Sequence, residues 1–273
     1  MFYDYNGIKC FYKYEERGSR HTLVLIHGFG GSSADWEPFV EVLGEKQNYL
    51  LIDLPGCGQS EFTSDSAFYT FEGLGGLISS LIDCLSIKSP VICGYSAGGR
   101  LVYYITAHNL VKSQAGFVAI STTPGIPDKA MRQDRREGDI HHAKMIAEHG
   151  IDEWVENWLN LDLFEGLKYL SPEFNEEYRK RRLKNNTEVL QKYLLHSGLG
   201  IQEPLQPLLR ESTLPGLLIS GGNDEKYCEI GNRVIRLNNK FKHFVIEGAW
   251  HTLYLEKPEE TARLIENFLT ELN

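Results

Sequence analysis

Residues 94–98 read Gly-Tyr-Ser-Ala-Gly, which places Ser96 between two glycines in the pattern Gly-x-Ser-x-Gly. The pattern follows a short apolar run and precedes a helix-like segment, residues 100–107. In that strand–turn–helix context the motif presents a serine hydroxyl at the end of a strand. Glycine permits the tight turn, and the N-terminus of the following helix favours developing negative charge. We predict that Ser96 is a catalytic serine; the alternative interpretation is a chance glycine/serine turn.

A catalytic serine needs a histidine as base, and the histidine needs a carboxylate that orients it. When this motif is catalytic, the order along the chain is serine, acid, histidine. Asp224 follows a late apolar run and His251 follows the last one, so we predict these two residues as acid and base. Glu225 and Asp83 are the alternative acids and are less well placed. The alternative base, His243, opens an apolar run instead of following one.

A glycine-rich segment, residues 27–31 (His-Gly-Phe-Gly-Gly), follows the first strongly apolar run. Such a loop can direct a backbone N–H at the reacting oxygen, together with the N–H of the residue after the serine. We therefore predict an oxyanion hole formed by the backbone of Phe29 and Ala97, with a plain turn as the alternative. The segment lacks the spacing of a dinucleotide-binding or phosphate-binding loop.

The elements that must position these residues are short apolar runs that alternate with helix-like segments. Continuous apolar runs are typical of strands buried on both faces of a parallel sheet. The runs are residues 22–26, 49–52, 90–93, 116–120, 217–220 and 243–246. Apolar residues at helical spacing in residues 73–85 and 259–272 predict helices between and after the strands. The pattern indicates a mostly parallel, doubly wound α/β sheet.

Residues 124–207 interrupt this alternation. The segment is helix-like, aromatic and charged, and it contains no clear buried strand. We predict a helical cap over these residues and an α/β core formed by residues 1–123 and 208–273. An independent second domain is the alternative, but the strand–helix pattern resumes afterwards.

The predicted cap is rich in arginine, and Arg100 lies four residues after Ser96, on about the same helix face. Arginine pairs in bidentate fashion with planar carboxylates. We expect at least one of Arg100, Arg135 and Arg182 to face the pocket and bind a small carboxylate substrate. The alternative for each is a solvated helix face, or pairing with nearby acidic residues.

The composition excludes several classes of protein. The net charge of −9 argues against nucleic-acid binding. The five cysteines form no Cys-x-x-Cys pair and the adjacent His141 and His142 point apart on a helix, so we expect no metal. The chain begins with no signal-peptide pattern, and no apolar run approaches the ~20 residues of a membrane span. Free thiols suit a reducing compartment, so we expect a cytoplasmic protein.

The chain resembles the 2-succinyl-6-hydroxy-2,4-cyclohexadiene-1-carboxylate synthases of menaquinone (vitamin K2) biosynthesis, which have the α/β-hydrolase fold. The resemblance covers nearly the whole chain. In the core it rests on residues 94–100, which end in an arginine, on residues 27–31 through Trp36, and on residues 53–56. In the cap and the acid loop it rests on residues 124–126, Arg132, Arg135, Trp158, residues 163–164, 182–186, 198–200 and 224–227. The chain departs from the family at Cys57, Ala97 and Trp250.

The resemblance implies a lyase that eliminates pyruvate from a polycarboxylate cyclohexene intermediate and needs no cofactor. Ser96, activated by His251 and Asp224, would start proton abstraction. Phe29 and Ala97 would hold the enolate oxygen. The remaining implied substrate contacts are Tyr95, Arg100, Arg135, Trp158 and Arg182. Two alternatives stay open: a serine hydrolase with the same triad (a carboxylesterase or a carbon–carbon bond hydrolase) and a non-catalytic binder on the same fold.

Overall fold

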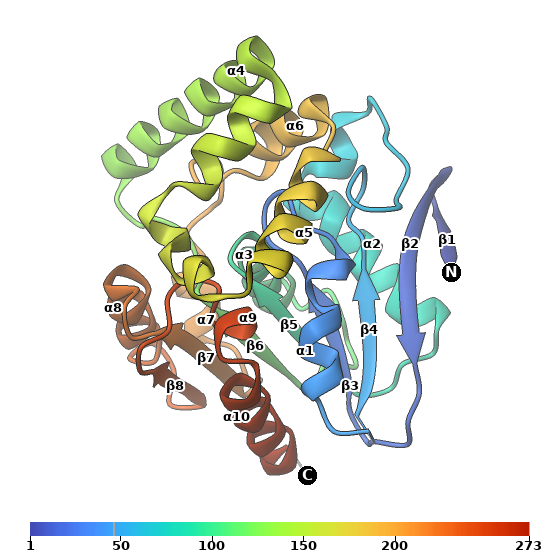
Figure 1. The fold of residues 1–273 in the computed structure, drawn as a ribbon. Helices are drawn as coiled ribbons and strands as arrows, with labels where there is room; N and C mark the ends of the chain where they lie inside the picture. Colours follow the sequence, from blue (N-terminus) through green and yellow to red (C-terminus); the bar gives the residue numbers. More distant parts are fainter. Residues whose placement is uncertain (46, 273) are drawn as a thin grey trace.

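The computed structural model describes residues 1–45 and 47–272, and a single sheet of eight strands organises them (Figure 1). The strand order is β1-β2-β4-β3-β5-β6-β7-β8. Strands β3 to β8 run parallel, and the β1–β2 and β2–β4 pairs are antiparallel. The bounds are β1 Phe2–Tyr5, β2 Ile8–Glu15, β3 Thr22–Ile26, β4 Asn48–Ile52, β5 Pro90–Tyr95, β6 Gly116–Ile120, β7 Gly216–Gly221 and β8 Phe241–Ile246.

All six apolar runs form strands, and β3 to β7 are buried along their whole length. Burial on both faces explains why these strands are continuously apolar. Strand β8 is different because it lies at the edge of the sheet. Phe244 and Val245 are each 44% exposed there, so the expectation of two buried faces is wrong for this strand.

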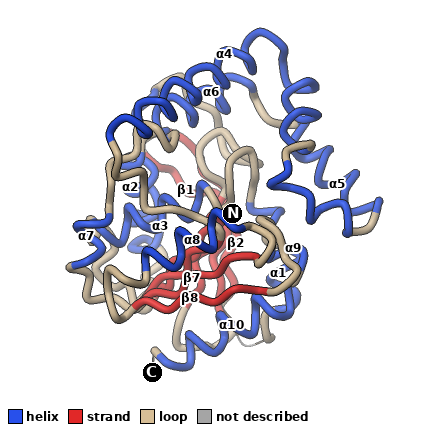
Figure 2. The backbone as a smooth tube through the Cα atoms, turned by 90° about the vertical axis from the view of Figure 1, so that its left-hand side faces the viewer, coloured by secondary structure: helices blue, strands red, loops and turns tan. Residues whose placement is uncertain are grey.

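Helices cover both faces of the sheet, as Figure 2 shows. Helices α1 (Glu37–Val42), α9 (Leu253–Glu256) and α10 (Pro258–Glu271) contribute to the core on one face. Helices α2 (Phe71–Cys84), α3 (Ala97–Ala107) and α8 (Glu225–Val234) contribute to the core on the other. Short 3₁₀ helices η1 (Ser33–Asp35) and η2 (Ser66–Tyr69) occupy two loops. The predicted doubly wound α/β architecture is confirmed.

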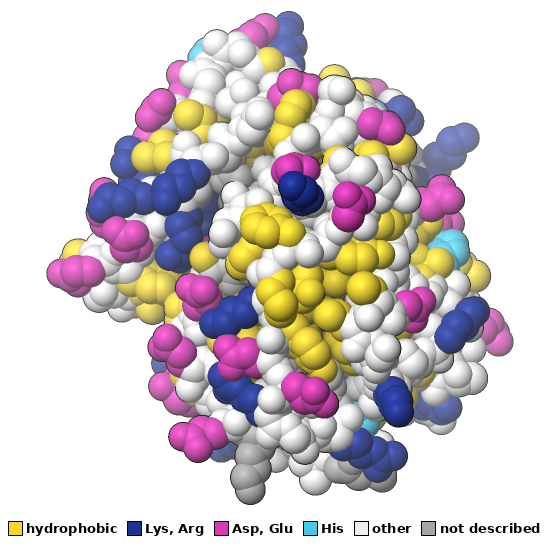
Figure 3. All heavy atoms as spheres, turned by 90° about the vertical axis from the view of Figure 1, so that its right-hand side faces the viewer, with side chains coloured by type: hydrophobic (Ala, Val, Ile, Leu, Met, Phe, Trp, Pro, Cys, Tyr) yellow, Lys and Arg dark blue, Asp and Glu magenta, His cyan; other side chains and the backbone are white. Residues whose placement is uncertain are grey.

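The antiparallel β1–β2 hairpin was not predicted. The alternation of apolar and polar residues that indicates a half-buried strand was present in the sequence: Ile8 and Cys10 are buried, and Lys9 between them is exposed. On the side of the molecule where β1 and β2 lie, hydrophobic side chains gather into a patch (Figure 3). Exposed aromatic side chains of the chain include Phe2 and Phe62.

Between β6 and β7 the chain forms helices and, among the residues described, no strand. These are α4 (Lys129–Leu159), η3 (Asp162–Tyr169), α5 (Pro172–Leu183), α6 (Thr187–Ser197) and α7 (Gln206–Arg210). Gly150, at φ +80°, divides α4 into two helical parts. Helices α4, α5 and α6 project beyond one end of the sheet, and we call residues 124–207 the cap (Figure 1). No helix in the described ranges is long and apolar enough to cross a membrane.

Candidate active site

Ser96 occupies a sharp turn between β5 and α3. Its φ of +51° is a conformation that side chains rarely adopt, so the turn holds the serine in a strained geometry. The two flanking glycines make this turn possible. A Cβ atom on Gly94 would collide with the backbone of Gly98, and one on Gly98 would collide with the carbonyl oxygen of Ile26. The pattern Gly-x-Ser-x-Gly is therefore dictated by backbone packing as well as by chemistry.

Asp224 and His251 meet Ser96 at the carboxyl ends of the strands. His251 Nε2 lies 3.1 Å from Ser96 Oγ, and His251 Nδ1 lies 2.6 Å from Asp224 Oδ2. Both distances are hydrogen-bond distances, and the chain of contacts is the one a serine–histidine–aspartate triad requires. His251 is 1% exposed and Asp224 is 8% exposed, so water does not compete for their contact.

The alternative acids and base lie elsewhere. His243 contacts Ser220 Oγ at 3.0 Å and Asn232 Oδ1 at 3.1 Å, on the edge strand β8. Glu225 and Asp83 are exposed. None of the three has a hydrogen bond to Ser96 or His251 among the residues described.

Tyr95 packs behind the triad instead of lining the cavity, which corrects its prediction as a substrate contact. It is the last residue of β5 and is only 4% exposed. Its ring lies 5.2 Å from the ring of His251 and 4.9 Å from that of Tyr254. The side chain stays on the core side of the sheet end because the turn that follows it directs Ser96 outward.

Phe29 and Ala97 border the same cavity as Ser96. Ala97 is the first residue of α3, and the first N–H groups of a helix have no acceptor within the helix. The N–H of Phe29 donates no hydrogen bond within residues 1–45 and 47–272. Two free N–H groups beside a serine hydroxyl are what an oxyanion hole requires.

His27 supports this loop, a role that sequence reasoning did not assign. The side chain is 2% exposed; its Nδ1 lies 2.8 Å from the carbonyl oxygen of Gly28, and its Nε2 accepts from the N–H of Leu54 at 3.2 Å. Nδ1 therefore carries the proton in a neutral ring, because Nε2 must stay unprotonated to accept. Burial lowers the pKa of His27, which favours the same neutral state.

This burial predicts a pH dependence of stability. The unfolded chain takes up a proton on His27 near pH 6.5, whereas the folded protein resists it, so stability is lost as the pH falls below about 6.5. We expect the unfolding free energy of the wild type to fall more steeply than that of His27→Gln, by up to about 1.4 kcal/mol per pH unit. Urea unfolding at pH 7.5 and 5.5 measures the difference. Equal slopes would show that His27 is not held neutral.

The cavity in front of the triad has a volume of about 230 Å³. The core contributes Ser96, Arg100 and Tyr227 of α8, while the cap contributes Arg135 and Trp158. The structure thus brings together the triad, both N–H groups and three of the five predicted substrate contacts. Lys226 and His142 also line the cavity and were not predicted as substrate contacts. The sequence contains little indication of this position, because a lone lysine or histidine on a helix is usually solvated.

Positive charge dominates the polar wall of this cavity. Arg135 pairs with Asp139 at 2.7 Å, but no carboxylate of the described chain lies within ion-pair distance of Arg100. The guanidinium of Arg100 instead donates to the backbone oxygen of Ser197 at 2.7 Å and lies 5.9 Å from the ring of Phe71. Burial, and then the like charge of Arg135, lower the pKa of Arg100 to about 10. An anion in the cavity would relieve this unfavourable arrangement.

Arg182 does not face the cavity, and its prediction as a substrate contact is corrected. It donates two hydrogen bonds of 2.8 Å to the carboxylate of Asp35 and is 3% exposed. Its partner lies 147 residues earlier in the chain, so spacing alone gave no sign of the pairing.

A family model described as the alpha/beta hydrolase fold matches residues 21–258, and the chain belongs to this family. Within it, the chain is 28% identical over 267 residues to the putative 2-succinyl-6-hydroxy-2,4-cyclohexadiene-1-carboxylate synthase of Bacillus subtilis, covering 98% of this chain and 97% of the relative. The structure of MenH from S. aureus is 30% identical, with a TM-score of 0.90, over 96% of this chain and 98% of that one. The predicted resemblance is confirmed, and the chain is an enzyme.

More distant structures share only the fold. A thermophilic esterase from Thermogutta terrifontis is 21% identical, with a TM-score of 0.83, over 97% of this chain and 94% of the esterase. Since lyases and hydrolases are built on the same scaffold, the choice between them rests on the cavity.

Proposed function

We propose that the enzyme is a lyase that eliminates pyruvate from a polycarboxylate cyclohexene intermediate and gives 2-succinyl-6-hydroxy-2,4-cyclohexadiene-1-carboxylate in menaquinone biosynthesis. The observation that carries the proposal is Arg100. Its guanidinium lines the cavity of Ser96 and has no carboxylate partner among the described residues. A substrate carboxylate supplies that partner. The relatives named for this reaction support the same assignment.

In the proposed reaction Ser96 acts as a base. His251 Nε2 accepts the hydroxyl proton across the 3.1 Å contact, and the Ser96 oxygen removes the ring proton beside the succinyl carbonyl. Asp224 orients the imidazole and stabilises its charged form. The released electron pair moves onto the carbonyl oxygen, where the N–H groups of Phe29 and Ala97 stabilise it.

The electron pair then returns to the ring. A second ring double bond forms as the bond between the ring and the oxygen of the leaving pyruvate breaks. The proton held by His251 can return to the leaving group, which departs as pyruvate. Atoms balance without water, so the reaction is an elimination and not a hydrolysis.

The cationic wall orients the substrate for this step. We propose that Arg100 and Arg135 bind substrate carboxylates, with Lys226 at the rim and the ring of Trp158 against the apolar part of the substrate. Since Arg135 already pairs with Asp139, Arg100 is the stronger of the two anion-binding groups.

A serine hydrolase is the second candidate, because the same triad and N–H groups could form and release an acyl-enzyme. The test is turnover of the pyruvate-bearing cyclohexene substrate beside a short-chain nitrophenyl ester, compared by kcat/KM. We expect the carboxylate substrate to be preferred by several orders of magnitude. A burst of nitrophenol followed by rapid ester turnover, with no pyruvate formed, would assign the enzyme to the hydrolases.

A further inference from the structure

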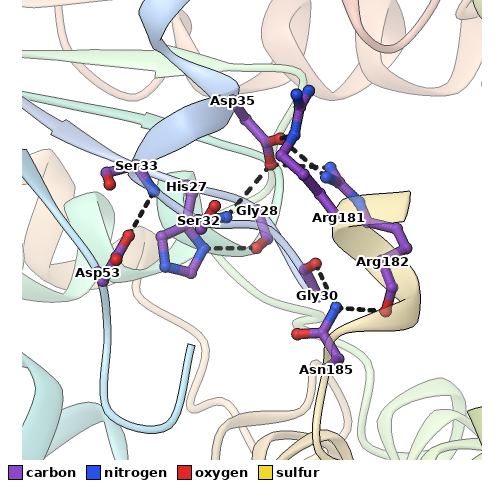
Figure 4. A network of polar contacts seen from close by, with 10 residues as sticks. All are labelled: His27, Gly28, Gly30, Ser32, Ser33, Asp35, Asp53, Arg181, Arg182 and Asn185. Atoms are coloured by element: carbon purple, nitrogen blue, oxygen red, sulfur yellow. Dashed lines mark hydrogen bonds and ion pairs between the residues drawn. The ribbon is translucent and has the colours of Figure 1, made fainter. Parts of the chain in front are cut away.

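Two cap residues at the end of α5 reach across to the loop that carries Phe29. Figure 4 shows Arg182 and Asn185 on the cap side and Gly30 and Asp35 on the core side, joined by a network of polar contacts that runs from Arg182 to Asp35 and from Asn185 to Gly30. The loop is the segment proposed to hold the substrate oxygen, so the network connects the cap directly to the reaction.

The first connection is the buried pair of Arg182 and Asp35. Burial raises the pKa of Asp35, but the charge and hydrogen bonds of Arg182, together with the charges of Arg181 and His27, outweigh burial and hold that pKa below its usual value. The guanidinium also lies 3.6 Å from the ring centre of Tyr178. A buried ion pair contributes little net stability compared with apolar packing, but removing one partner leaves the other charge poorly compensated. Arg181 Nε also donates to Asp35 Oδ1, at 3.2 Å, so Asp35 keeps one cationic partner when Arg182 is replaced. The pair therefore fixes geometry more than it stabilises the fold.

Asp35 passes this constraint to the loop. Its Oδ2 accepts from the N–H of Ser32 at 3.3 Å and would lie 2.6 Å from a Cβ atom on Gly31, so the carboxylate packs directly on the loop backbone. The amide of Asn185 makes the second connection. It donates to the carbonyl oxygen of Gly30 at 2.9 Å and to the carbonyl oxygen of Arg182 at 2.9 Å.

Further contacts of the loop also come from the cap. Gly30 has a φ of +65°, and a Cβ atom there would meet the ring of Trp154 at 2.7 Å. The ring of Phe29 lies 5.9 Å from that of Trp154 and 5.3 Å from that of Trp158. Cap groups thus contact the side chain of Phe29 and the carbonyl oxygen of Gly30, which flank the peptide unit between these two residues.

We infer that Arg182 and Asn185 are positioning residues: docking of the cap onto Asp35 and Gly30 aligns the N–H of Phe29 with the substrate oxygen. The inference rests on the proposed function in assigning that oxygen to an enolate. Neither residue touches the substrate in this account. Their loss should lower the stabilisation of the transition state, because an N–H group displaced by about 1 Å loses most of its effect on a developing charge.

The test uses Asn185→Asp and Arg182→Met. The first keeps size but removes the amide donor, and the second keeps an apolar side chain about as long as the aliphatic stem of arginine but removes the guanidinium with its charge and hydrogen bonds. We expect kcat to fall between about tenfold and a hundredfold, with KM changed less than about threefold. Matched controls are Asn160→Asp, which removes an exposed hydrogen bond from the side-chain amide to the backbone oxygen of Glu156, and Arg179→Met, which removes an exposed ion pair between Arg179 on α5 and Glu156 on α4. Both controls should keep wild-type kcat.

A second readout separates positioning from a merely structural role. A boronic acid forms a tetrahedral adduct on a catalytic serine, with an oxygen in the oxyanion hole. Misalignment of the N–H should raise the Kd of the boronic acid by about the same factor as kcat falls. Thermal unfolding curves of the same variants should show that they are folded. Partial unfolding would reduce the number of binding sites and leave Kd unchanged, and that result would overturn the inference.

The two proposals fail separately. Boronate binding needs only the serine and the N–H groups. A wild type that binds boronate without eliminating pyruvate, and whose Asn185→Asp variant binds it more weakly, would refute the lyase assignment and support the inference. A wild type that binds no boronate, or variants with unchanged Kd and kcat, would overturn the inference.

Discussion

Ser96→Ala should lower pyruvate elimination by about 10³-fold or more, the upper part of the range for removing a positioned proton-transfer group. In the proposed reaction, the variant lacks the oxygen that removes the ring proton. The substrate still meets the same cationic wall, because Arg100 and Arg135 are unchanged. We therefore expect KM or substrate Kd to change little while kcat collapses. Steady-state kinetics with pyruvate detection, and substrate titration by fluorescence, measure the two quantities.

Ser113→Ala is the control for this substitution. Within the described residues, the hydroxyl of Ser113 makes one hydrogen bond, to the backbone oxygen of Ile87 at 3.4 Å, and Ser113 does not line the cavity of Ser96, so its variant should keep full activity. A Ser96→Ala protein that retains a tenth or more of wild-type turnover would place the chemistry on another group.

Arg100→Met should lower kcat/KM for the carboxylate substrate by roughly 10²-fold, which corresponds to the loss of about 3 kcal/mol from one desolvated, charge-assisted pair. Methionine replaces about the aliphatic stem of the arginine and removes the guanidinium, so the change is mainly the loss of its charge and hydrogen bonds. A neutral nitrophenyl ester has no carboxylate that could pair with Arg100. Its kcat/KM should therefore stay within about threefold of wild type, and the ratio between the two substrates is the diagnostic quantity.

Arg100→Lys completes this experiment. It keeps a positive charge but loses the planar, bidentate geometry, so activity on the carboxylate substrate should lie between those of the wild type and Arg100→Met. Equal losses on the carboxylate and the neutral ester would instead indicate damage to α3, and would contradict a carboxylate-binding role for Arg100.

The core of the candidate site could be predicted from sequence because its geometry is set by short-range rules. Ser96 and Asp224 follow the buried strands β5 and β7, and His251 follows the edge strand β8; parallel strands that end at one edge bring such residues together. The glycines around Ser96 are required by close backbone contacts, so the motif itself predicted the turn. The strands of the core were visible for the same reason, since burial on both faces demands continuous apolar runs.

The cap was less predictable, because its side chains are directed by long-range packing. Arg100 and Arg182 look alike in sequence, yet one lines the cavity and the other pairs with Asp35 inside the cap–core interface. No local pattern distinguishes them. Tyr95 was misassigned for a related reason: its neighbour Ser96 faces the cavity, but the strained turn between them sends the tyrosine ring into the core.

The central claim is that one cavity combines a serine base with a carboxylate-binding wall to eliminate pyruvate. Product stoichiometry tests it most directly: purified enzyme converts the cyclohexene substrate while pyruvate and the absorbance of the conjugated cyclohexadiene are followed together. The account predicts one diene for each pyruvate, with no product that has gained water. Pyruvate released without the diene, or a product heavier by one water, would show hydrolysis and contradict the claim.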